Sequence, residues 1–404
     1  MSDTFDAIIV GAGPAGSTAA ILLAQAGWSV ALVEKHAFPR RKVCGECIAA
    51  TNLPLLDALG VGASFAALAG PELRRVGLFV GAHELVAPLP RDGGSAHPWG
   101  RALGREHLDS LLLQRAAAVG ATLWQPWTVK RITREGNQHI CQLSATRPGA
   151  SATLSAPILI AAHGSWERDP AGASVASAPH RGDLFGFKAT FGNADIAAGL
   201  LPVLAFAGGY GGMVLGDHGR TTFAFCIRRD ALRDCRTRRR HLPAALAAAA
   251  HVHTQCTGVR RVLATATLVA PWLSTGPIRP GLREPWRGDG MFAIGNVAGE
   301  AHPILGEGIS MAIQSAWLLC ERLLAREADL RPESARPTGS LNEVGRDYAA
   351  AWHGNFAPRI RLAAAFAHLA MRPGLSHPLL PVLRHWPNLL TTSARFGAKV
   401  RHVV

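Results

Sequence analysis

A glycine-rich turn between two short apolar runs is the feature that most constrains what this chain can fold into. Residues 6–10 (DAIIV) are typical of a buried strand, residues 17–26 of a helix and residues 28–33 of a second buried strand. The turn at residues 11–16 reads GAGPAG, and Glu34 ends the second strand. A GxGxxG turn alone is a weak signal, but strands on both sides and an acid about 20 positions later make it specific. These features predict a βαβ unit that binds a dinucleotide.

Each part of this unit has a chemical role. Gly11 would make the tight turn, Gly13 would let the backbone approach a pyrophosphate, and Gly16 would let the helix pack closely on the strand. The pyrophosphate would lie at the helix N-terminus, where backbone N–H groups are unpaired. Glu34 would accept hydrogen bonds from ribose hydroxyls and disfavours a 2′-phosphate, so FAD or NAD is predicted rather than NADP. The residues expected to contact the nucleotide here are Gly11, Gly13, Pro14, Ala15, Gly16, Glu34 and Lys35.

The composition is that of a folded protein with a basic surface. Of the 404 residues, 48% are hydrophobic and 17% are charged, which excludes disorder driven by low hydrophobicity and high charge. The formal net charge of +14 favours acidic partners. Nucleic acid is not predicted as a partner, because the basic residues are scattered and no zinc-finger spacing or RNA-binding aromatic signature accompanies them. A coding bias toward arginine would explain the charge without any partner.

The cysteines and the apolar segments predict a soluble, cytoplasmic protein. Seven cysteines, an odd number spread along a large chain, do not form the disulfide framework of a small secreted domain. The apolar stretch 7–33 follows Asp3 and Asp6, where a signal peptide would carry positive charge, and glycines interrupt it. Elsewhere proline or charge breaks each apolar run before about 18 residues, so no integral membrane segment is predicted.

Further segments distinguish between the candidate nucleotides. Residues 38–46 read FPRRKVCGE, residues 293–299 read AIGNVAG and residues 303–309 read PILGEGI. Together they resemble the flavoprotein superfamily with the p-hydroxybenzoate hydroxylase fold, in the branch that holds geranylgeranyl reductases, flavin-dependent halogenases and related monooxygenases. Residues 105–109 (REHLD) are similar to the Arg-x-x-Leu-Asp helix of that family. The resemblance covers about residues 5–330 and implies FAD as the cofactor.

The resemblance also implies where the flavin lies. In that family a strand ends in Gly-Asp, whose acid binds the ribityl chain, and the loop Pro-x-x-Gly-x-Gly begins a helix aimed at the isoalloxazine. The positive helix end would stabilise anionic reduced flavin. Here Gly295 fits and Asn296 replaces the acid, so looser or differently tuned FAD binding is expected. The resemblance adds as FAD contacts Arg41, Cys44, Arg105, Gly295, Asn296, Gly306, Gly308 and Ile309.

The electron donor does not follow from the resemblance. Aromatic hydroxylases of this family have an Asp-Gly loop that is tied to the pyridine nucleotide, and His163 stands in place of that aspartate. No second strand–GxGxxG–helix pattern is present in the sequence. NADH or NADPH is therefore expected to bind transiently, or a separate flavin reductase to deliver the electrons.

The expected fold class is α/β (α+β mixed): a Rossmann-type FAD-binding domain with an inserted antiparallel β-sheet substrate domain and a C-terminal helical cap. The substrate is expected between the inserted sheet and the flavin, since ligand pockets form at domain interfaces. The expected boundaries are 1–75, 100–168 and 276–330 for the discontinuous FAD-binding domain, 76–99 and 169–275 for the substrate domain, and 331–404 for the helical region.

Few catalytic side chains are expected, because a flavin carries its own chemistry. His302 and Glu307 flank the flavin-facing loop, where proton transfer would be useful, and Glu46 could donate a proton. A structural role for His302 is an equal alternative. Cys44 and Cys47 form a CxxC pair that could simply pack a loop, and no further ligands at zinc spacing accompany them, so no metal site is predicted.

We therefore expect an FAD-dependent monooxygenase that uses O2 through a flavin C4a-hydroperoxide to hydroxylate an aromatic group. The substrate is either an aromatic small molecule or an aromatic residue, such as tryptophan, on an acidic peptide or carrier protein. Some proteins that resemble this chain are monooxygenases of tryptophylquinone maturation. The dense arginine cluster at 228–240 could dock an acidic protein or could be a solvated face.

Two other reactions stay open. A geranylgeranyl-reductase-like enzyme that reduces isoprenoid or polyene double bonds is the alternative, because residues 303–309 fit that branch well. A flavin-dependent halogenase is disfavoured, since the Trp-x-Trp-x-Ile-Pro signature of tryptophan halogenases is absent. Dependence of product formation on oxygen would separate hydroxylation from reduction.

Overall fold

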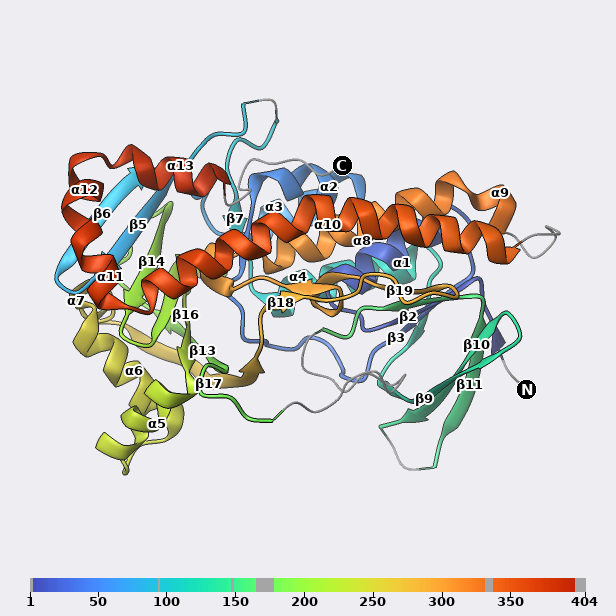
Figure 1. Cartoon of the computed structure of the whole chain (residues 1–404), viewed down its shortest axis with the longest axis horizontal. Coiled ribbons are helices and arrows are strands. Elements are labelled where there is room, and N and C mark those ends of the chain that lie inside the picture. The colour runs from blue at the N-terminus through green and yellow to red at the C-terminus, as the bar shows by residue number, and fades with distance from the viewer. Residues whose placement is uncertain (1–2, 94, 147–148, 165–177, 331–336, 397–404) are drawn as a thin grey trace.

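The computed structural model describes residues 3–93, 95–146, 149–164, 178–330 and 337–396 (Figure 1). It confirms the expected mixed α/β class, with a parallel sheet, a second large sheet and a C-terminal helical region. The helices in these residues are α1 (Pro14–Gln25), α2 (Leu53–Ala58), α3 (Gly62–Leu68), α4 (Arg105–Ala118), α5 (Arg229–Arg238), α6 (Ala244–Gln255), α7 (Thr257–Val262), α8 (Gly308–Ala325), α9 (Glu327–Leu330), α10 (Pro337–Ala370), α11 (Pro373–Ser376), α12 (Leu380–His385) and α13 (Asn388–Phe396).

A five-stranded parallel sheet forms the centre of the nucleotide-binding part. Its strands, in spatial order, are β19 (Met291–Ala293), β12 (Ile158–Ala161), β2 (Ala7–Val10), β3 (Val30–Val33) and β8 (Thr122–Trp124). Alternate side chains of the strands enter two different cores. Ile9 and Leu32 pack with helices α1, α4 and α8, whereas Ile8 and Val33 pack against a second sheet. Since both faces are covered, the strands are apolar throughout, as parallel sheets require.

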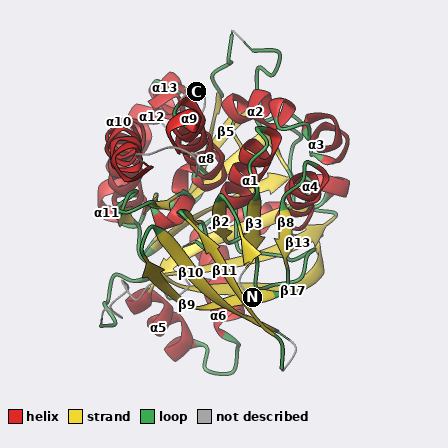
Figure 2. Ribbon diagram, turned by 90° about the vertical axis from the view of Figure 1, so that its right-hand side faces the viewer, coloured by secondary structure: helices red, strands yellow, loops and turns green. Residues whose placement is uncertain are grey.

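The four-stranded sheet against which Ile8 and Val33 pack was not predicted from the sequence. It has four strands in the order β1 (Asp3–Thr4), β11 (Ser151–Ala156), β10 (Gln138–Ala145) and β9 (Trp127–Glu135). Its apolar face, with Cys141 and Leu154, covers the side of the parallel sheet that faces away from α1. Figure 2 shows the resulting layers, with helices α1, α4 and α8 above the parallel sheet and β9–β11 below it.

A seven-stranded sheet forms the other half of the molecule. Its order is β17 (Thr267–Ile278), β13 (Leu184–Gly192), β16 (Thr221–Arg228), β15 (Gly209–Leu215), β14 (Leu200–Phe206), β5 (Arg75–Val80) and β6 (His83–Pro88). The pairing is antiparallel except between β14 and β5, which are parallel. Phe223 and Ile227 point into a core with α6 and α7, while Cys226 points to the opposite face with Tyr210. The face with Tyr210 can therefore roof a cavity together with the C-terminal helices that pack on it.

The remaining elements close the edges of the two halves. Two short ladders pair β4 (Cys47–Ile48) with β7 (Arg101–Ala102) and β18 (Gly281–Leu282) with β20 (Gly299–Glu300). Helix α10 runs the length of the molecule beside α8, and α11–α13 then reach β5 and β6 at the far end (Figure 1). None of the helices in the described ranges combines the length and apolarity needed to cross a bilayer.

Candidate active site

A cavity of about 1150 Å³ lies between the parallel sheet and the seven-stranded sheet. Its lining begins at the glycine turn after β2, passes the N-terminus of α8, and ends at side chains of α12 and α13. This volume exceeds the ~300–1,000 Å³ of a typical small-molecule pocket. The cavity is therefore large enough for a cofactor at one end and a second molecule at the other.

The glycine turn fits a dinucleotide because side chains there would collide with backbone. A Cβ at Gly11, where φ is +105°, would lie 2.6 Å from the Ala162 carbonyl oxygen. A Cβ at Gly16 would lie 1.8 Å from the Gly11 carbonyl oxygen. Gly11, Gly13, Pro14 and Ala15 line the cavity, so the turn presents backbone to a ligand as its sequence predicts.

Glu34 is held in place at the end of β3. Its Oε2 atom accepts a hydrogen bond from the Ala12 backbone N–H (3.0 Å), and Oε1 accepts one from the His36 N–H (2.9 Å). The side chain is buried and lines the cavity next to Lys35. The acid thus both fixes the turn and faces the position expected for a ribose.

Three cationic side chains face the same end of the cavity: Arg40, Lys42 and Arg105. Arg105 is buried and donates two hydrogen bonds of 2.7 Å to Asp109, which fixes its guanidinium beside Gly13. Burial, reinforced by the charges of Arg105 and Arg40, lowers the pKa of Lys42 to about 8. Cations that repel one another around the N-terminus of α1 fit a diphosphate anion.

Of the three adjacent basic residues Arg40, Arg41 and Lys42, only Arg41 was predicted from the sequence to contact the cofactor. Its guanidinium instead donates to the Pro271 carbonyl of β17 (3.1 Å), and Arg41 does not line the cavity. Lys42, which does, was missed. The signal was present in the Arg40-Arg41-Lys42 run, but which of three adjacent side chains points inward depends on the loop that carries them.

The second predicted cofactor segment begins α8. Gly295, with φ +59°, donates its N–H to Ser315 Oγ (2.8 Å), and Gly306 adopts φ +66° just before the helix. Gly306, Gly308 and Ile309 line the cavity, so the helix N-terminus points into it. The positive helix end therefore faces the cavity, where the flavin ring is predicted to lie.

Asn296, which replaces the family acid, lines the cavity together with an acid that the sequence analysis did not use. The Asn296 side-chain amide donates to Glu300 Oε1 (3.1 Å), and Glu300 also lies 3.5 Å from Arg283. Glu300 is buried and lines the cavity. A carboxylate is therefore present at this position in space, supplied four residues later in the chain.

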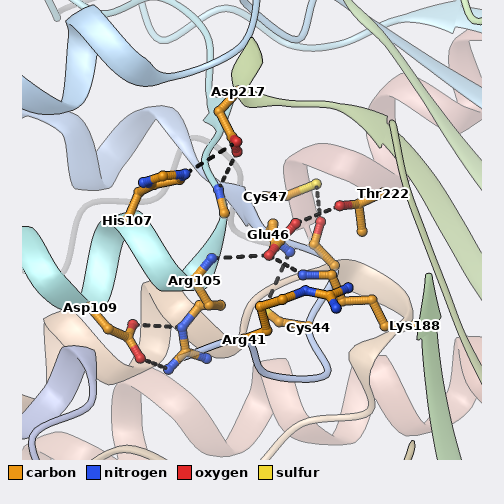
Figure 3. Close-up of polar contacts among 12 residues, drawn as sticks. Arg41, Cys44, Glu46, Cys47, Arg105, His107, Asp109, Lys188, Asp217 and Thr222 are labelled. Atoms are coloured by element: carbon orange, nitrogen blue, oxygen red, sulfur yellow. Dashed lines mark hydrogen bonds and ion pairs between the residues drawn. The ribbon is translucent and has the colours of Figure 1, made fainter. Parts of the chain in front are cut away.

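Figure 3 shows that Glu46 is occupied by structural contacts. Its Oε1 accepts hydrogen bonds from the Arg105 backbone N–H (3.0 Å) and from the Lys188 ammonium, and its Oε2 accepts one from Thr222 Oγ (2.5 Å). Glu46 and Lys188 are both buried. Because Lys188 and Thr222 belong to the seven-stranded sheet, this ion pair ties the two halves of the molecule together. Glu46 lines the cavity, but its hydrogen-bonding oxygens are engaged.

Glu307 points away from the cavity. Its Oε2 atom pairs with the buried guanidinium of Arg359 in α10, which also donates to Gln314 Oε1 (2.7 Å). Glu307 does not line the cavity, although its neighbours Gly306 and Gly308 do. The contact fastens α10 to the start of α8, a role that the sequence analysis did not foresee.

His302 lies one residue behind the cavity wall. Its Nδ1 is 3.0 Å from the hydroxyl of Tyr210, and Tyr210 lines the cavity while His302 does not. Burial, together with His368, lowers the pKa of His302 to about 4. Burial, with Cys226 and Glu300 nearby, raises the pKa of Tyr210 well above its usual value. Both side chains are therefore neutral near pH 7, and Tyr210 is a candidate site residue that sequence reasoning missed.

The end of the cavity beyond Tyr210 is apolar. It is formed by β5, β14 and β15 of the sheet and by the C-terminal helices. Representative lining residues are Leu78, Val203, Met213, Ile304, Phe366 and Leu383. We call this part of the cavity the apolar lobe.

Two further groups of side chains are of types that can bind metal ions. Cys44 and the buried Cys47 both line the cavity, and neither forms a disulfide. His107, Asp217 and His218 place one ligand atom each within 4.8 Å of the others, outside the cavity lining. Asp217 accepts a hydrogen bond from the Gly104 N–H (2.8 Å), so it holds the loop after β15 against the start of α4 (Figure 3).

Taken with its glycine turn, acid and cations, the cavity defines an FAD-dependent oxidoreductase. The family model described as "FAD binding domain" matches residues 4–334, and the chain belongs to this family. The family match covers the parallel sheet, the seven-stranded sheet and α8, but not α10–α13.

Curated proteins that are similar to this chain are named for different reactions. The chain is 27% identical to menaquinone reductase of Mycobacterium tuberculosis over 186 residues, which are 46% of this chain and 43% of that protein. It is 30% identical to tryptophan 2-halogenase of Chondromyces crocatus over 158 residues, which are 39% and 30% of the two proteins. The chain thus matches less than half the length of these relatives.

Solved structures show the same fold over nearly the whole chain. The flavin-dependent brominase Bmp2 superposes with a TM-score of 0.78 at 17% identity, covering 98% of this chain and 94% of that one. The p-nitrophenol 4-monooxygenase PnpA of Pseudomonas putida superposes with a TM-score of 0.74 at 15% identity, covering 99% of each chain. At such identities the likeness shows the fold alone.

Proposed function

We propose that this oxidoreductase is a monooxygenase that hydroxylates an aromatic group held in the apolar lobe. The observation that carries the proposal is the hydrogen bond between Tyr210, which lines the cavity, and His302 behind it. When bound, FAD would supply the redox chemistry, with electrons from NADH, NADPH or a separate flavin reductase and with O2 as the oxidant.

The residues at the cofactor end would hold FAD in a defined orientation. Arg40, Lys42 and Arg105 would surround the diphosphate, and Glu34 would bind the adenosine ribose. Asn296 and Glu300 lie where they could hydrogen-bond the ribityl chain. The flavin ring would then lie against the N-terminus of α8, next to the apolar lobe.

Tyr210 would orient a polar group on the aromatic ring. Two neutral partners 3.0 Å apart share one proton between them, so the Tyr210 hydroxyl can donate to a substrate while His302 Nδ1–H donates to the Tyr210 oxygen. The same pair can accept a hydrogen bond from a substrate hydroxyl when Tyr210 donates its own proton in a hydrogen bond to the unprotonated Nδ1 of His302. The substrate is thereby held without placing a net charge in a water-excluding lobe.

The same protonation states make net proton donation difficult. Saturation of a carbon–carbon double bond requires a proton as well as a hydride, and the pKa of His302 near 4 leaves that side chain unprotonated at neutral pH. Tyr210 keeps its proton because its pKa is raised. The pair therefore suits hydrogen-bonded orientation of a polar group on the substrate.

The partner in this proposal is an aromatic small molecule or an aromatic side chain on a peptide or carrier protein. The arginines at 228–240 do not line the cavity. Helix α5, which carries most of them, packs on the core face of the seven-stranded sheet that holds Phe223, opposite the face of Tyr210. Docking of an acidic protein through this cluster would therefore occur away from the cavity.

The test follows isotopic oxygen in turnover of the FAD-loaded protein. Candidate phenols, indoles and tryptophan peptides are incubated with NADH, NADPH or a flavin reductase under ¹⁸O2, in the presence and absence of chloride and bromide. One ¹⁸O atom in the product supports the proposal. A product that forms without O2 and gains two hydrogens, or a halogenated product that requires halide, refutes it.

The two tyrosines of the chain provide a matched pair of variants. Tyr210→Phe should lower kcat/KM by about 10- to 100-fold, since a hydrogen bond to the reacting substrate contributes roughly 1–3 kcal/mol. Tyr348→Phe removes a hydrogen bond of 2.8 Å to the Ala293 carbonyl, outside the cavity lining, and should leave kcat/KM within about twofold. Equal losses in the two variants would remove Tyr210 from the proposal.

A further inference from the structure

We propose that helices α11–α13 dock this protein on a membrane surface that contains anionic phospholipids. Exposed apolar side chains gather on these helices. Half of the large hydrophobic side chains exposed in the described ranges lie between residues 375 and 389. We call them the C-terminal apolar patch: Leu375, Leu379, Val382, Trp386 and Leu389. A concentration of this kind on one surface marks an interaction site.

The helices are apolar on both sides, which a water-facing helix is not. Leu380 is buried, and Leu383 and Leu390 line the cavity. The opposite side of the same short helices carries the patch, with Trp386 57% exposed. A helix at a protein–water boundary normally presents polar residues outward. The outward side of α11–α13 therefore matches an apolar medium rather than water.

The charge around the patch selects an anionic lipid surface. The sequence contains no aspartate or glutamate after Asp347. Arg372, Arg384 and Arg395 are exposed at the edges of the patch. Basic residues beside exposed leucine and tryptophan are the pattern of an interfacial segment, in which apolar side chains enter the acyl boundary and cations meet anionic headgroups.

Helix α5 forms another basic surface of this protein, which differs from the patch because it is charged but not apolar. It carries Arg233, Arg236 and Arg238, but Asp230 and Asp234 lie among them. None of its residues belongs to the exposed large hydrophobic set of the described chain. Figures 1 and 2 place α5 and the α11–α13 helices on opposite sides of the seven-stranded sheet. The two basic surfaces are thus separate, and the apolar patch accompanies one of them.

The cavity adjoins the patch at Leu379, which lines the cavity and is also 40% exposed. In a docked protein this end of the cavity would lie next to the bilayer, and an apolar aromatic substrate would have a short path into the apolar lobe. This last step rests on the proposed function, whereas docking itself does not.

The experiment measures flotation of the full-length, FAD-loaded protein with vesicles. Vesicles of phosphatidylcholine alone are compared with vesicles that contain 30% phosphatidylglycerol. We expect flotation with the anionic vesicles and much weaker flotation with neutral ones or at high salt, since lipid electrostatics are screened. Absence of flotation with anionic vesicles would overturn the proposal.

Variants test which residues bind the vesicle surface. Val382→Ser/Trp386→Ser/Leu389→Ser changes patch residues that do not line the cavity, and should reduce vesicle affinity at least 30-fold. The control, Leu268→Ser/Val269→Ser, changes side chains of similar exposure on β17 and should change affinity less than twofold. Equal losses in patch and control variants would contradict docking through the patch.

Charge variants provide an independent test of binding to anionic vesicles. Arg384→Glu/Arg395→Glu should weaken binding to anionic vesicles about 30-fold, because each arginine near such a surface contributes about one kcal/mol. Arg236→Glu/Arg240→Glu places the same charges on the α5 side and should have less than a threefold effect. A larger effect of the α5-side variant would assign membrane binding to α5 and overturn the proposal.

Measurements on the same variants also test two other binding partners for the patch. If a second copy of the chain covers it, the wild-type protein will be a dimer in solution and the triple serine variant a monomer. If an acidic protein covers it, a soluble polyglutamate probe will bind wild type but not Arg384→Glu/Arg395→Glu. Either result without vesicle binding overturns the proposal. Because flotation needs no substrate, failure of the monooxygenase proposal would leave this test intact.

Discussion

Replacement of Lys188 by methionine tests whether Glu46 holds the two halves of the protein together or takes part in catalysis. Lys188 is 1% exposed on β13, and its ammonium pairs with the buried carboxylate of Glu46. Lys188→Met removes the cation and keeps much of the side-chain volume. It leaves Glu46 with hydrogen bonds from Thr222 Oγ (2.5 Å) and the Arg105 N–H (3.0 Å).

The magnitude follows from the charge that is left behind. Breaking a buried ion pair by removing one partner costs about 3–5 kcal/mol, because the other charge is left uncompensated. The two hydrogen bonds that remain on Glu46 stabilise its charge, so we expect a loss near the lower limit, about 3 kcal/mol. Lys188→Met/Glu46→Gln removes both charges and should cost at least 2 kcal/mol less than the sum of the single variants, as coupled neighbours do.

The assay is urea unfolding followed by circular dichroism, with and without saturating FAD. The surface variant Arg131→Met, outside the cavity lining, is the control and should lie within about 0.5 kcal/mol of wild type. A loss below 1 kcal/mol for Lys188→Met, or simple additivity in the double variant, would refute the structural role. A Glu46→Gln protein of wild-type stability with an altered pH profile of kcat would instead make Glu46 a catalytic acid.

Three further perturbations test the cofactor end of the cavity. Raising the pH through about 8 should deprotonate Lys42 in the apoprotein, remove a cation facing the diphosphate and weaken FAD binding; fluorescence titrations of Lys42→Met should lack this pH dependence. Asn296→Asp should raise the FAD Kd about tenfold by placing a carboxylate beside Glu300, and Asn296→Asp/Glu300→Gln should restore affinity, which calorimetric titration would show. Gly16→Ala should yield protein without FAD, because its Cβ would lie 1.8 Å from the Gly11 carbonyl oxygen; a normal FAD content after purification would contradict this geometry.

The cofactor end was predictable because its chemistry is local in the sequence. The glycine turn, the helix that follows it and Glu34 lie within one βαβ unit, and their spacing leaves little choice of geometry. Even here the prediction was reliable for backbone and less so for side chains. Arg41 and Lys42 are adjacent, yet one reaches the Pro271 carbonyl and the other the cavity.

The other side of the cavity depends on contacts between distant residues. Tyr210 lies in a glycine-rich strand that carries no recognised motif, and its partner His302 is 92 residues away. Glu307 stands beside the flavin-facing loop in the sequence, but Arg359, 52 residues later, draws its carboxylate toward α10. Which direction a side chain takes at the start of a helix depends on what packs there, and sequence spacing does not contain that information.

The apolar lobe, where we propose that the substrate binds, lies partly outside the family match. That match ends at residue 334, while the cavity lining continues through residues 366–394 of α10, α12 and α13. The cofactor end of the cavity thus lies within the family match, and part of the apolar lobe lies beyond it. In this chain those helices close the apolar lobe on one side and carry the C-terminal apolar patch on the other. Changes in these helices would alter which molecules reach the flavin without touching the residues that hold it.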